Sequence, residues 1–454
     1  MMTGPVLAVD QGTSGTKALV ICPERGVLGT GFAEVRPRHL PAGRVEADPA
    51  QLYDSVLEAG SRALAEAGEA VVALGLANQG ETVLAWDPTT GRPLTDALVW
   101  QDRRAESVCS ELSWCADELR ALTGLPLDPY FAAPKMAWIR RHLTREGVVT
   151  TSDAWLVHRL TGAFVTDAAT AGRTQLLDLD RAQWSERALD LYGLADERLP
   201  EVVDNARQVG VTRAFGPEIP LTGLAVDQQA ALLAQRVTAP GGAKCTYGTG
   251  AFLLAHTGTV PRRGDAGLVS CVAWQLGGRT DYCLDGQVYT AASAVRWLHR
   301  PGVIRVQRSA GSPTWASSRA QPTSTRWEVR CPTAAGSPSS RALAGTRGPV
   351  VSGDLRSSLT GLGPGHRPRA VGAEHCAKAW RHRSSRFAEA AATELGAPLD
   401  ALRVDRRPQL RSTLLMQTQA DLLQTPPWRC RHCRTRRRWA WAAWPASARN
   451  PAWR

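Results

Sequence analysis

The sequence predicts an α/β protein of two similar domains, and three observations support this prediction. The chain of 454 residues is long enough for two domains with a large buried core. Two hairpins of β-type sequence with glycine-rich turns, at residues 6–21 and 243–254, share one design although they lie far apart. Strands and helices alternate between them, and polar clusters follow the strand ends. This order is typical of an α/β sheet with a site at its edge.

The first hairpin joins the apolar runs 6–9 and 18–21 through a polar turn. Gly12 and Gly15 allow φ > 0 and let successive N–H groups approach an anion. The turn also offers three hydroxyl donors, a positive charge, and a carboxylate suited to a hydrated Mg²⁺. These are Thr13, Ser14 and Thr16, then Lys17, and then Asp10. These features predict a phosphate-binding hairpin. An ordinary hairpin turn with Gly and Asp is the alternative interpretation.

The next segments alternate in type. Residues 27–35 are a third strand candidate, and apolar residues at helical spacing predict a helix over 48–68. The continuous apolar run 70–77 is typical of a strand buried on both faces. A polar stretch, residues 78–82, follows where this strand should end.

Further polar clusters lie between the predicted elements. Residues 99–104 combine an aromatic, an amide and charges, and residues 125–131 form a Pro-fixed turn with an aromatic pair. Asp227 follows the buried strand candidate 219–226 and precedes two amides, which is a suitable place for a general base. The alternative is that Asp227 only caps the helix that follows.

Composition narrows the class of protein. No apolar run approaches the 18 residues of a membrane-spanning helix, and the N-terminus lacks a signal-peptide pattern. The ten cysteines have no framework spacing, which suits reduced thiols. We therefore expect a cytoplasmic location. The net charge of +12 comes from the residues after 300, where 26 Lys and Arg stand against 8 Asp and Glu.

Six motifs in sequence order resemble those of the FGGY carbohydrate kinases, and most closely those of the glycerol kinase branch. The similarity is continuous from residue 5 to about residue 300. The motifs are Asp10-Gln-Gly-Thr, Asn78-Gln-Gly-Glu-Thr, Val99-Trp-Gln-Asp-Arg-Arg, Asp128-Pro-Tyr-Phe, Asp227-Gln-Gln-Ala-Ala-Leu and Thr246-Tyr-Gly-Thr-Gly. The resemblance implies two ribonuclease-H-like domains of the actin/hexokinase type with a cleft between them. We expect an N-terminal domain at 1–240, a C-terminal ATP-binding domain at 241–426, and an aberrant tail at 427–454.

The resemblance also implies a reaction: the γ-phosphoryl group of ATP passes to a hydroxyl of a small polyol or sugar, with Mg²⁺. Glycerol is the first candidate substrate. We expect no nucleic-acid partner and no membrane partner, and the sequence is compatible with a homo-oligomer.

Residue roles follow by the same resemblance. Asp227 would be the catalytic base, and Asp10 would hold Mg²⁺ through water. The polyol would contact Gly80, Glu81, Trp100, Tyr130, Asp227 and Gln228. The ATP phosphates would contact Gly12, Thr13, Ser14, Gly15, Lys17, Gly248, Thr249 and Gly302.

One position departs from the family pattern. Glycerol kinases usually have Arg where this chain has Gly80. The missing side chain removes a charged contact to a terminal hydroxyl and leaves room for a longer polyol. A kinase for another sugar or polyol, such as a pentulose or tetritol, is therefore a second hypothesis.

The pattern breaks after about residue 300. Residues 305–343 are rich in Ser, Pro, Thr, Arg and Trp, and show no helical or strand period. Fragments of the family pattern return at 344–349, 358–362 and 388–423. The expected Gly-Gly pair that follows residue 405 is replaced by Arg406-Arg407-Pro408. A decayed, inactive kinase is therefore a third hypothesis.

Two motifs in the tail are weak evidence for a metal site or a binding surface. Cys430 and Cys433 have the spacing of half a zinc site, but no second pair follows them. The basic, Trp-containing stretch 434–444 resembles a nucleic-acid or membrane-surface patch without any surrounding module.

We hypothesise that the residues after about 300 are partly frame-shifted. The chain holds four lysines against fifty arginines, which fits a GC-rich gene, and off-frame reading of such DNA yields Arg, Pro, Ala, Ser and Trp. Resequencing the locus should reveal compensating insertions or deletions beyond codon 300. An uninterrupted frame together with a folded C-terminal half would contradict the hypothesis.

Overall fold

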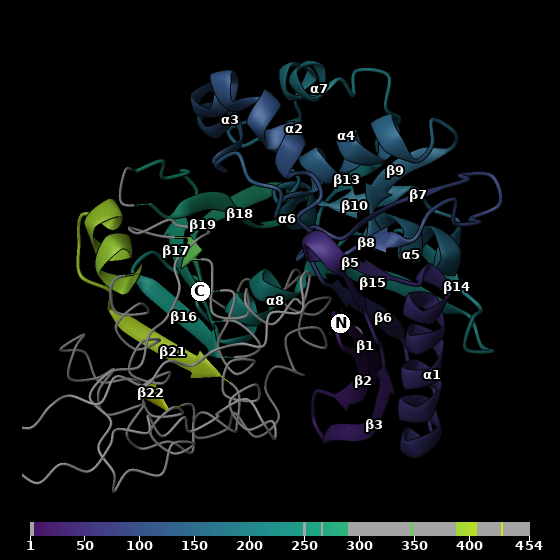
Figure 1. Ribbon diagram of the computed structural model, residues 1–454. Helices are drawn as coiled ribbons and strands as arrows, with labels where there is room; N and C mark the ends of the chain where they lie inside the picture. Colours follow the sequence, from purple (N-terminus) through teal and green to yellow (C-terminus); the bar gives the residue numbers. More distant parts are fainter. Residues whose placement is uncertain are drawn as a thin grey trace, which may run out of the picture.

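The computed structural model describes residues 4–247, 251–264, 267–288, 346–347, 387–405 and 428–429. The described strands form two large mixed sheets, a five-stranded sheet and two short ribbons, with helices between and around them (Figure 1). The predicted α/β class is confirmed. The domain boundaries at 240 and 426 remain predictions.

The first sheet has the strand order β14-β15-β6-β1-β2-β3. β1 and β2 pair antiparallel as the predicted hairpin, while β6 runs parallel to β1 and β15 runs parallel to β6. The carboxyl ends of β1, β6 and β15 therefore lie side by side. The strands are β1 (Val6–Gly12), β2 (Gly15–Cys22), β3 (Gly26–Glu34), β6 (Ala73–Asn78), β14 (Gly210–Thr212) and β15 (Ile219–Val226).

Helix α1 (Pro49–Ala67) confirms the helix predicted from apolar spacing, and it lies along β3 and β2 (Figure 1). Asp48 starts the helix by accepting a hydrogen bond from the Ala50 amide, and Pro49 has the fixed φ that suits the first turn. Gly68, in the left-handed region at φ 67°, ends it. Leu52 and Val56 are among the side chains that α1 buries in the core.

Side chains alternate between two cores along β1. Leu7 and Val9 face the core that contains α1, and Val6 and Ala8 face a second core. That second core also contains side chains of α8 (Asp227–Ala234), β17 (Ala251–Gly258) and β18 (Val269–Leu276). Because successive residues of a strand point to opposite faces, the first sheet is buried on both sides. The face that carries Val6 and Ala8 is the one turned toward the second sheet.

The second large sheet repeats the arrangement of the first. β16 (Gly242–Tyr247) and β17 form an antiparallel hairpin, β19 (Arg279–Val288) pairs with β17, and β21 (Ala401–Asp405) runs parallel to β16. In the first sheet, β1, β2, β3 and β6 have the same relations. The sheet is extended by β18, β20 (Thr346–Arg347) and β22 (Trp428–Arg429).

The remaining strands form a five-stranded sheet and two short ribbons. The five-stranded sheet comprises β4 (Arg38–Leu40), β5 (Arg44–Ala47), β8 (Ala97–Leu98), β7 (Val83–Trp86) and β9 (Val148–Thr151). The ribbons pair β10 (Val165–Asp167) with β13 (Glu201–Val203), and β11 (Leu177–Asp178) with β12 (Gln183–Trp184).

The other helices are α2 (Glu106–Glu111), α3 (Ala116–Thr123), α4 (Ala132–His142), α5 (Ser152–Thr161), α6 (Ala168–Ala171) and α7 (Glu186–Tyr192). Two short 3₁₀ turns lie at Pro41–Gly43 and Ser113–Cys115, and residues 387–395 are also helical. Among the described residues, no helix is both long and apolar enough to cross a membrane.

The contact between α1 and β3 depends on a glycine without a side chain. A Cβ atom at Gly31 would collide with the carbonyl oxygen of Ala59 on α1. Gly31→Ala should therefore destabilise the fold by about 3 kcal/mol, because the clash is with backbone and cannot be relieved by a rotamer change. Chemical denaturation followed by circular dichroism measures the loss.

Thr30→Ala on the same strand is the matched control. Thr30 is exposed and its hydroxyl bonds only to the exposed Glu66, so the change should cost less than about 1 kcal/mol. Equal losses in the two variants would contradict the packing argument.

Candidate active site

A hydrogen bond from the side chain of Trp100 fixes the tip of the β1–β2 hairpin. Gly12 pairs with Gly15 in the strand register, so Thr13 and Ser14 form the two-residue tip. The indole Nε1 of Trp100 donates a hydrogen bond to Thr13 Oγ1 over 2.8 Å. The tip is therefore a defined loop with two hydroxyls, as the sequence predicted.

Asp10 and Lys17 lie directly opposite each other on the two strands of this hairpin. Residues opposite each other in an antiparallel pair share a face of the sheet. For Asp10 this is the face of Val6 and Ala8, which is turned toward the second sheet. The predicted magnesium ligand therefore faces the part of the molecule where the second hairpin lies.

An amide network that the predicted site set lacks joins the ends of β1 and β6. Gln11 is buried, and its Oε1 accepts hydrogen bonds from Asn78 Nδ2 at 2.9 Å and Gln79 Nε2 at 3.2 Å. Asn78 Oδ1 accepts in turn from Ser152 Oγ at 2.9 Å. These bonds fix the polar stretch that follows β6.

Glu81 follows β6 in a strained backbone conformation. Its φ of 61° is in the left-handed region, which a residue with a side chain rarely adopts. The side chain is buried, and burial is the main cause that raises its pKa above the usual range. Beside it, a Cβ at Gly80 would approach Val226 Cγ2 to 3.0 Å and meet no other described atom within 4 Å.

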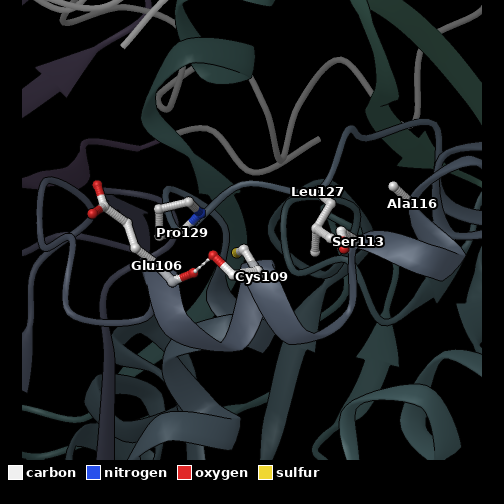
Figure 2. Close-up of a pocket in the computed structure, with 7 residues that line it drawn as sticks. Glu106, Cys109, Ser113, Ala116, Leu127 and Pro129 are labelled. Atoms are coloured by element: carbon white, nitrogen blue, oxygen red, sulfur yellow. Dashed lines mark hydrogen bonds between the residues drawn. The ribbon is translucent and has the colours of Figure 1, made fainter. Parts of the chain in front are cut away.

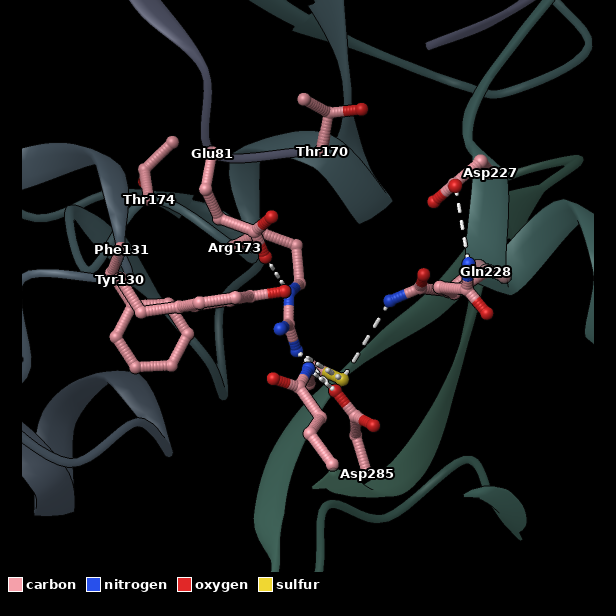
Figure 3. A network of polar contacts seen from close by, with 12 residues as sticks. Glu81, Tyr130, Phe131, Thr170, Arg173, Thr174, Asp227, Gln228 and Asp285 are labelled. Atoms are coloured by element: carbon pink, nitrogen blue, oxygen red, sulfur yellow. Dashed lines mark hydrogen bonds and ion pairs between the residues drawn. The ribbon is translucent and has the colours of Figure 1, made fainter. Parts of the chain in front are cut away.

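Arg173 joins Glu81 to the second sheet. Its Nε lies 2.6 Å from Glu81 Oε1, and its Nη1 lies 2.9 Å from Asp285 Oδ2 on β19. Figure 3 shows these three side chains in one chain of contacts, with Asp227 and Gln228 on the opposite side of the view. Arg173 is absent from the predicted site set. The one local signal was a single charged residue inside an otherwise uncharged run from 168 to 177.

Aromatic side chains line the neighbourhood of Glu81. The Trp100 and Tyr130 rings meet edge to face with centroids 5.6 Å apart, and Phe252 of β17 lies 6.5 Å from Trp100. The turn that carries Tyr130 is held by buried Lys135, whose Nζ donates to the carbonyls of residues 129, 130 and 131. Burial lowers the pKa of Lys135 to about 8.

Asp227 is the first residue of α8, directly after β15. Val226 holds the N-cap position and no side chain caps this helix, so the alternative role of Asp227 as a cap is wrong. The neighbouring Gln228 donates from Nε2 to Asp227 Oδ2 at 3.1 Å. Lys244 Nζ of β16 donates to Gln228 Oε1 at 2.8 Å and to Thr246 Oγ1 at 3.1 Å. The base candidate is thereby connected to the second sheet.

Part of the predicted site lies outside the described residues. Gly248, Thr249 and Gly302 belong to this part. Cys430 and Cys433 of the tail, which are not predicted site residues, also lie outside the described residues. The flanking residues Tyr247 and Ala251 pair with each other, so the strands on both sides of the predicted second turn do form a hairpin.

A surface hollow of about 410 Å³ contains none of the predicted site residues. Figure 2 shows that α2 contributes Glu106 and Cys109 to it, and Leu127 and Pro129 face them. Its walls carry one ionisable carboxylate and no strand-end cluster. It does not have the chemistry expected of the catalytic site.

The donor set fits a magnesium ion that arrives with a nucleotide. Mg²⁺ is usually held by one or two carboxylates together with substrate phosphates. Asp10 supplies such a carboxylate at a strand end, and the described residues contain no cluster of three metal-binding side chains. The described residues thus contain no Mg²⁺ site made of protein ligands alone. A site in which Asp10 and the nucleotide phosphates hold the ion together is chemically suitable.

Residues 5–234 match the model of the FGGY family of carbohydrate kinases, N-terminal domain. The chain is 38% identical over 440 residues to a glycerol kinase of Alkalilimnicola ehrlichii, covering 93% of this chain and 86% of the relative. It is 42% identical over 316 residues to a glycerol kinase of Thermus brockianus, covering 66% and 64%.

Solved structures agree in fold. The crystal structure of Plasmodium falciparum glycerol kinase with ADP has a TM-score of 0.76 at 25% identity, covering 93% of this chain and 85% of that one. A ligand-bound xylulose kinase from Lactobacillus acidophilus has a TM-score of 0.79 at 17% identity, covering 98% and 89%. The predicted two-domain, actin/hexokinase-type α/β class is confirmed by these structures. With residues 5–234 matched and relatives this similar over most of their length, the chain belongs to the FGGY family of carbohydrate kinases.

Proposed function

We propose that the chain catalyses the ATP-dependent phosphorylation of a small polyol, with glycerol as substrate and glycerol 3-phosphate as product. One observation carries the proposal: the carboxyl ends of β1, β6 and β15 lie side by side. They bring together a hydroxyl-rich hairpin tip, buried Glu81 and the carboxylate of Asp227. The similarity to glycerol kinases supports the choice of glycerol.

Asp227 acts as the general base in this proposal. Its carboxylate takes the proton of the attacking hydroxyl as the new O–P bond forms. ADP leaves with the electron pair of the O–P bond that breaks. Asp227 lies directly after β15, at the edge where β1 and β6 also end, and its carboxylate is suited to this role at that position.

The hairpin tip binds the transferred phosphoryl group. Thr13, Ser14 and the backbone N–H groups beside Gly12 and Gly15 supply donors where negative charge accumulates. Gly248, Thr249 and Gly302 complete the nucleotide contacts in the proposal. Asp10 would hold Mg²⁺ through water, and the bound ion would neutralise phosphate charge.

Glu81, Trp100, Tyr130 and Gln228 bind and orient the polyol. A buried carboxylate accepts hydrogen bonds from hydroxyls strongly, and the aromatic rings exclude water from the carbon chain. The absence of a side chain at Gly80, where glycerol kinases usually have Arg, supports a second candidate class, namely longer polyols or sugars such as tetritols and pentuloses.

An assay coupled to ADP release, run with glycerol and a panel of C3–C5 polyols and sugars, tests the activity. The highest kcat/KM for glycerol would support the main proposal, and a higher value for a longer substrate would support the second class. No turnover with any substrate would favour a decayed kinase.

The cytoplasmic location and any homo-oligomer also remain predictions.

The base assignment predicts the effect of Asp227→Asn. The variant keeps the shape of the side chain and removes its ability to take a proton, so kcat should fall about 1000-fold with KM nearly unchanged. Asp190→Asn, at an exposed carboxylate on α7, is the control and should retain full activity. Residual activity of Asp227→Asn above about one tenth would make the assignment wrong.

The hairpin geometry predicts the effect of Trp100→Phe. The variant keeps a ring in the polyol wall but removes the hydrogen bond to Thr13. We expect kcat/KM to fall about tenfold, which corresponds to one lost hydrogen bond. Trp184→Phe removes a similar indole bond, to the Pro200 carbonyl, and should leave kcat/KM unchanged. Equal losses in both variants would mean that the effect comes from a less stable protein and not from the lost bond to Thr13.

A further inference from the structure

We propose that Arg173 is a positioning residue for polyol recognition, which holds the Glu81 carboxylate in place and ties it to β19 of the second sheet. The inference rests on the proposed function, because it takes Glu81 as a polyol contact. Arg173 does not have to touch the substrate for this role. It acts through the two groups that it holds.

The geometry of Arg173 is that of a bridge between distant segments. It follows the short helix α6, yet its guanidinium contacts Glu81, beyond the end of β6, on one side and β19 on the other. The three side chains of the bridge are at most 5% exposed. Water therefore screens these ion pairs little.

The same guanidinium also packs on the aromatic wall. Its central carbon lies 5.8 Å from the ring centre of Tyr130 and 5.4 Å from that of Phe131. Arg173 thus contacts two groups of the proposed polyol site, Glu81 and Tyr130, at once (Figure 3). A change in its position would displace both.

The guanidinium of Arg173 favours the ionised form of Glu81. Burial raises the pKa of Glu81, and the nearby carboxylate of Asp227 raises it further. Arg173 is the largest opposing influence, and the positive charge of Lys135 on α4 also lowers this pKa. On the far side of the bridge, Asp285 and the Cys271 thiol face Arg173.

Without Arg173 the pKa of Glu81 would therefore be higher, and the carboxyl group would become protonated at a higher pH than in the wild type. The sign is fixed by the chemistry: removal of a positive neighbour raises a carboxyl pKa, so the charged form disappears as the pH falls. A protonated Glu81 is a weaker acceptor for hydroxyl groups. Polyol affinity should then become pH-dependent and recover as the pH rises.

Polyol binding measured by calorimetry, without ATP, tests this inference on the full chain. Arg173→Gln should weaken glycerol binding at least tenfold at about pH 6 and clearly less at about pH 9. Arg173→Lys should restore part of the affinity. Glu81→Gln should bind weakly at every pH, and adding Arg173→Gln to it should cause little further loss.

Arg140→Gln is the matched control, because it also breaks a largely buried ion pair, with Glu197 at 2.6 Å. It should leave glycerol affinity and its pH profile unchanged. A loss in Arg173→Gln that is equal at both pH values, or the same loss in Arg140→Gln, would overturn the positioning role. If Arg173→Gln does not fold, Arg173→Lys still tests the pH profile.

A second measurement separates this inference from the proposed function. Infrared or carbon-13 NMR titration of the Glu81 carboxyl needs no substrate. Its pKa should rise in Arg173→Lys relative to the wild type, because the ammonium cannot reproduce the two-sided guanidinium bridge. An unchanged pKa would overturn the inference. If this pKa moves but the wild type binds none of the tested polyols, the proposed function fails and the charge coupling stands.

Discussion

The parallel pairing of β1, β6 and β15 is the constraint on which the site depends. The register places Asp10 beside Ala77, and Asn78 beside both Gln11 and Val226. Parallel strands end at the same edge, so three segments far apart in sequence deliver their following residues to one place. The strands form this edge through apolar packing on both faces, and Tyr130 and Trp100 of the proposed polyol site pack against the same cores.

Charge burial is the second organising feature. A guanidinium between two carboxylates, Glu81 and Asp285, is costly to desolvate and is weak evidence for stability. Apolar residues of similar volume would often be at least as stable. The ion-pair bridge lies near the end of β6, where Glu81 has a positive φ. Both features lower the stability of the fold, and they fit a site that holds its side chains in a fixed arrangement before the substrate binds.

Much of the first sheet could be predicted because its signals are local. Periodicity located α1, turn composition located the β1–β2 hairpin, and an apolar run located β6. Arg173 could not be found in this way, because its partners Glu81 and Asp285 lie far from it in the sequence. Lys244 could not be found either, because a single charged residue has no period. The resemblance to a family supplied the role of Asp227, which composition alone left open between a base and a helix cap.

The pairing of β16 with β21 has a consequence for synthesis of the chain. Residues 242–246 hydrogen-bond in parallel with residues 401–405, so one edge of β16 lacks this partner until the later segment leaves the ribosome. At about 5–20 residues per second, that delay is roughly 10–30 s. An uncovered strand edge is a template for association with other chains. Yield of folded protein should therefore depend on chaperones that act during translation, whereas the first sheet is complete once β15 has been made.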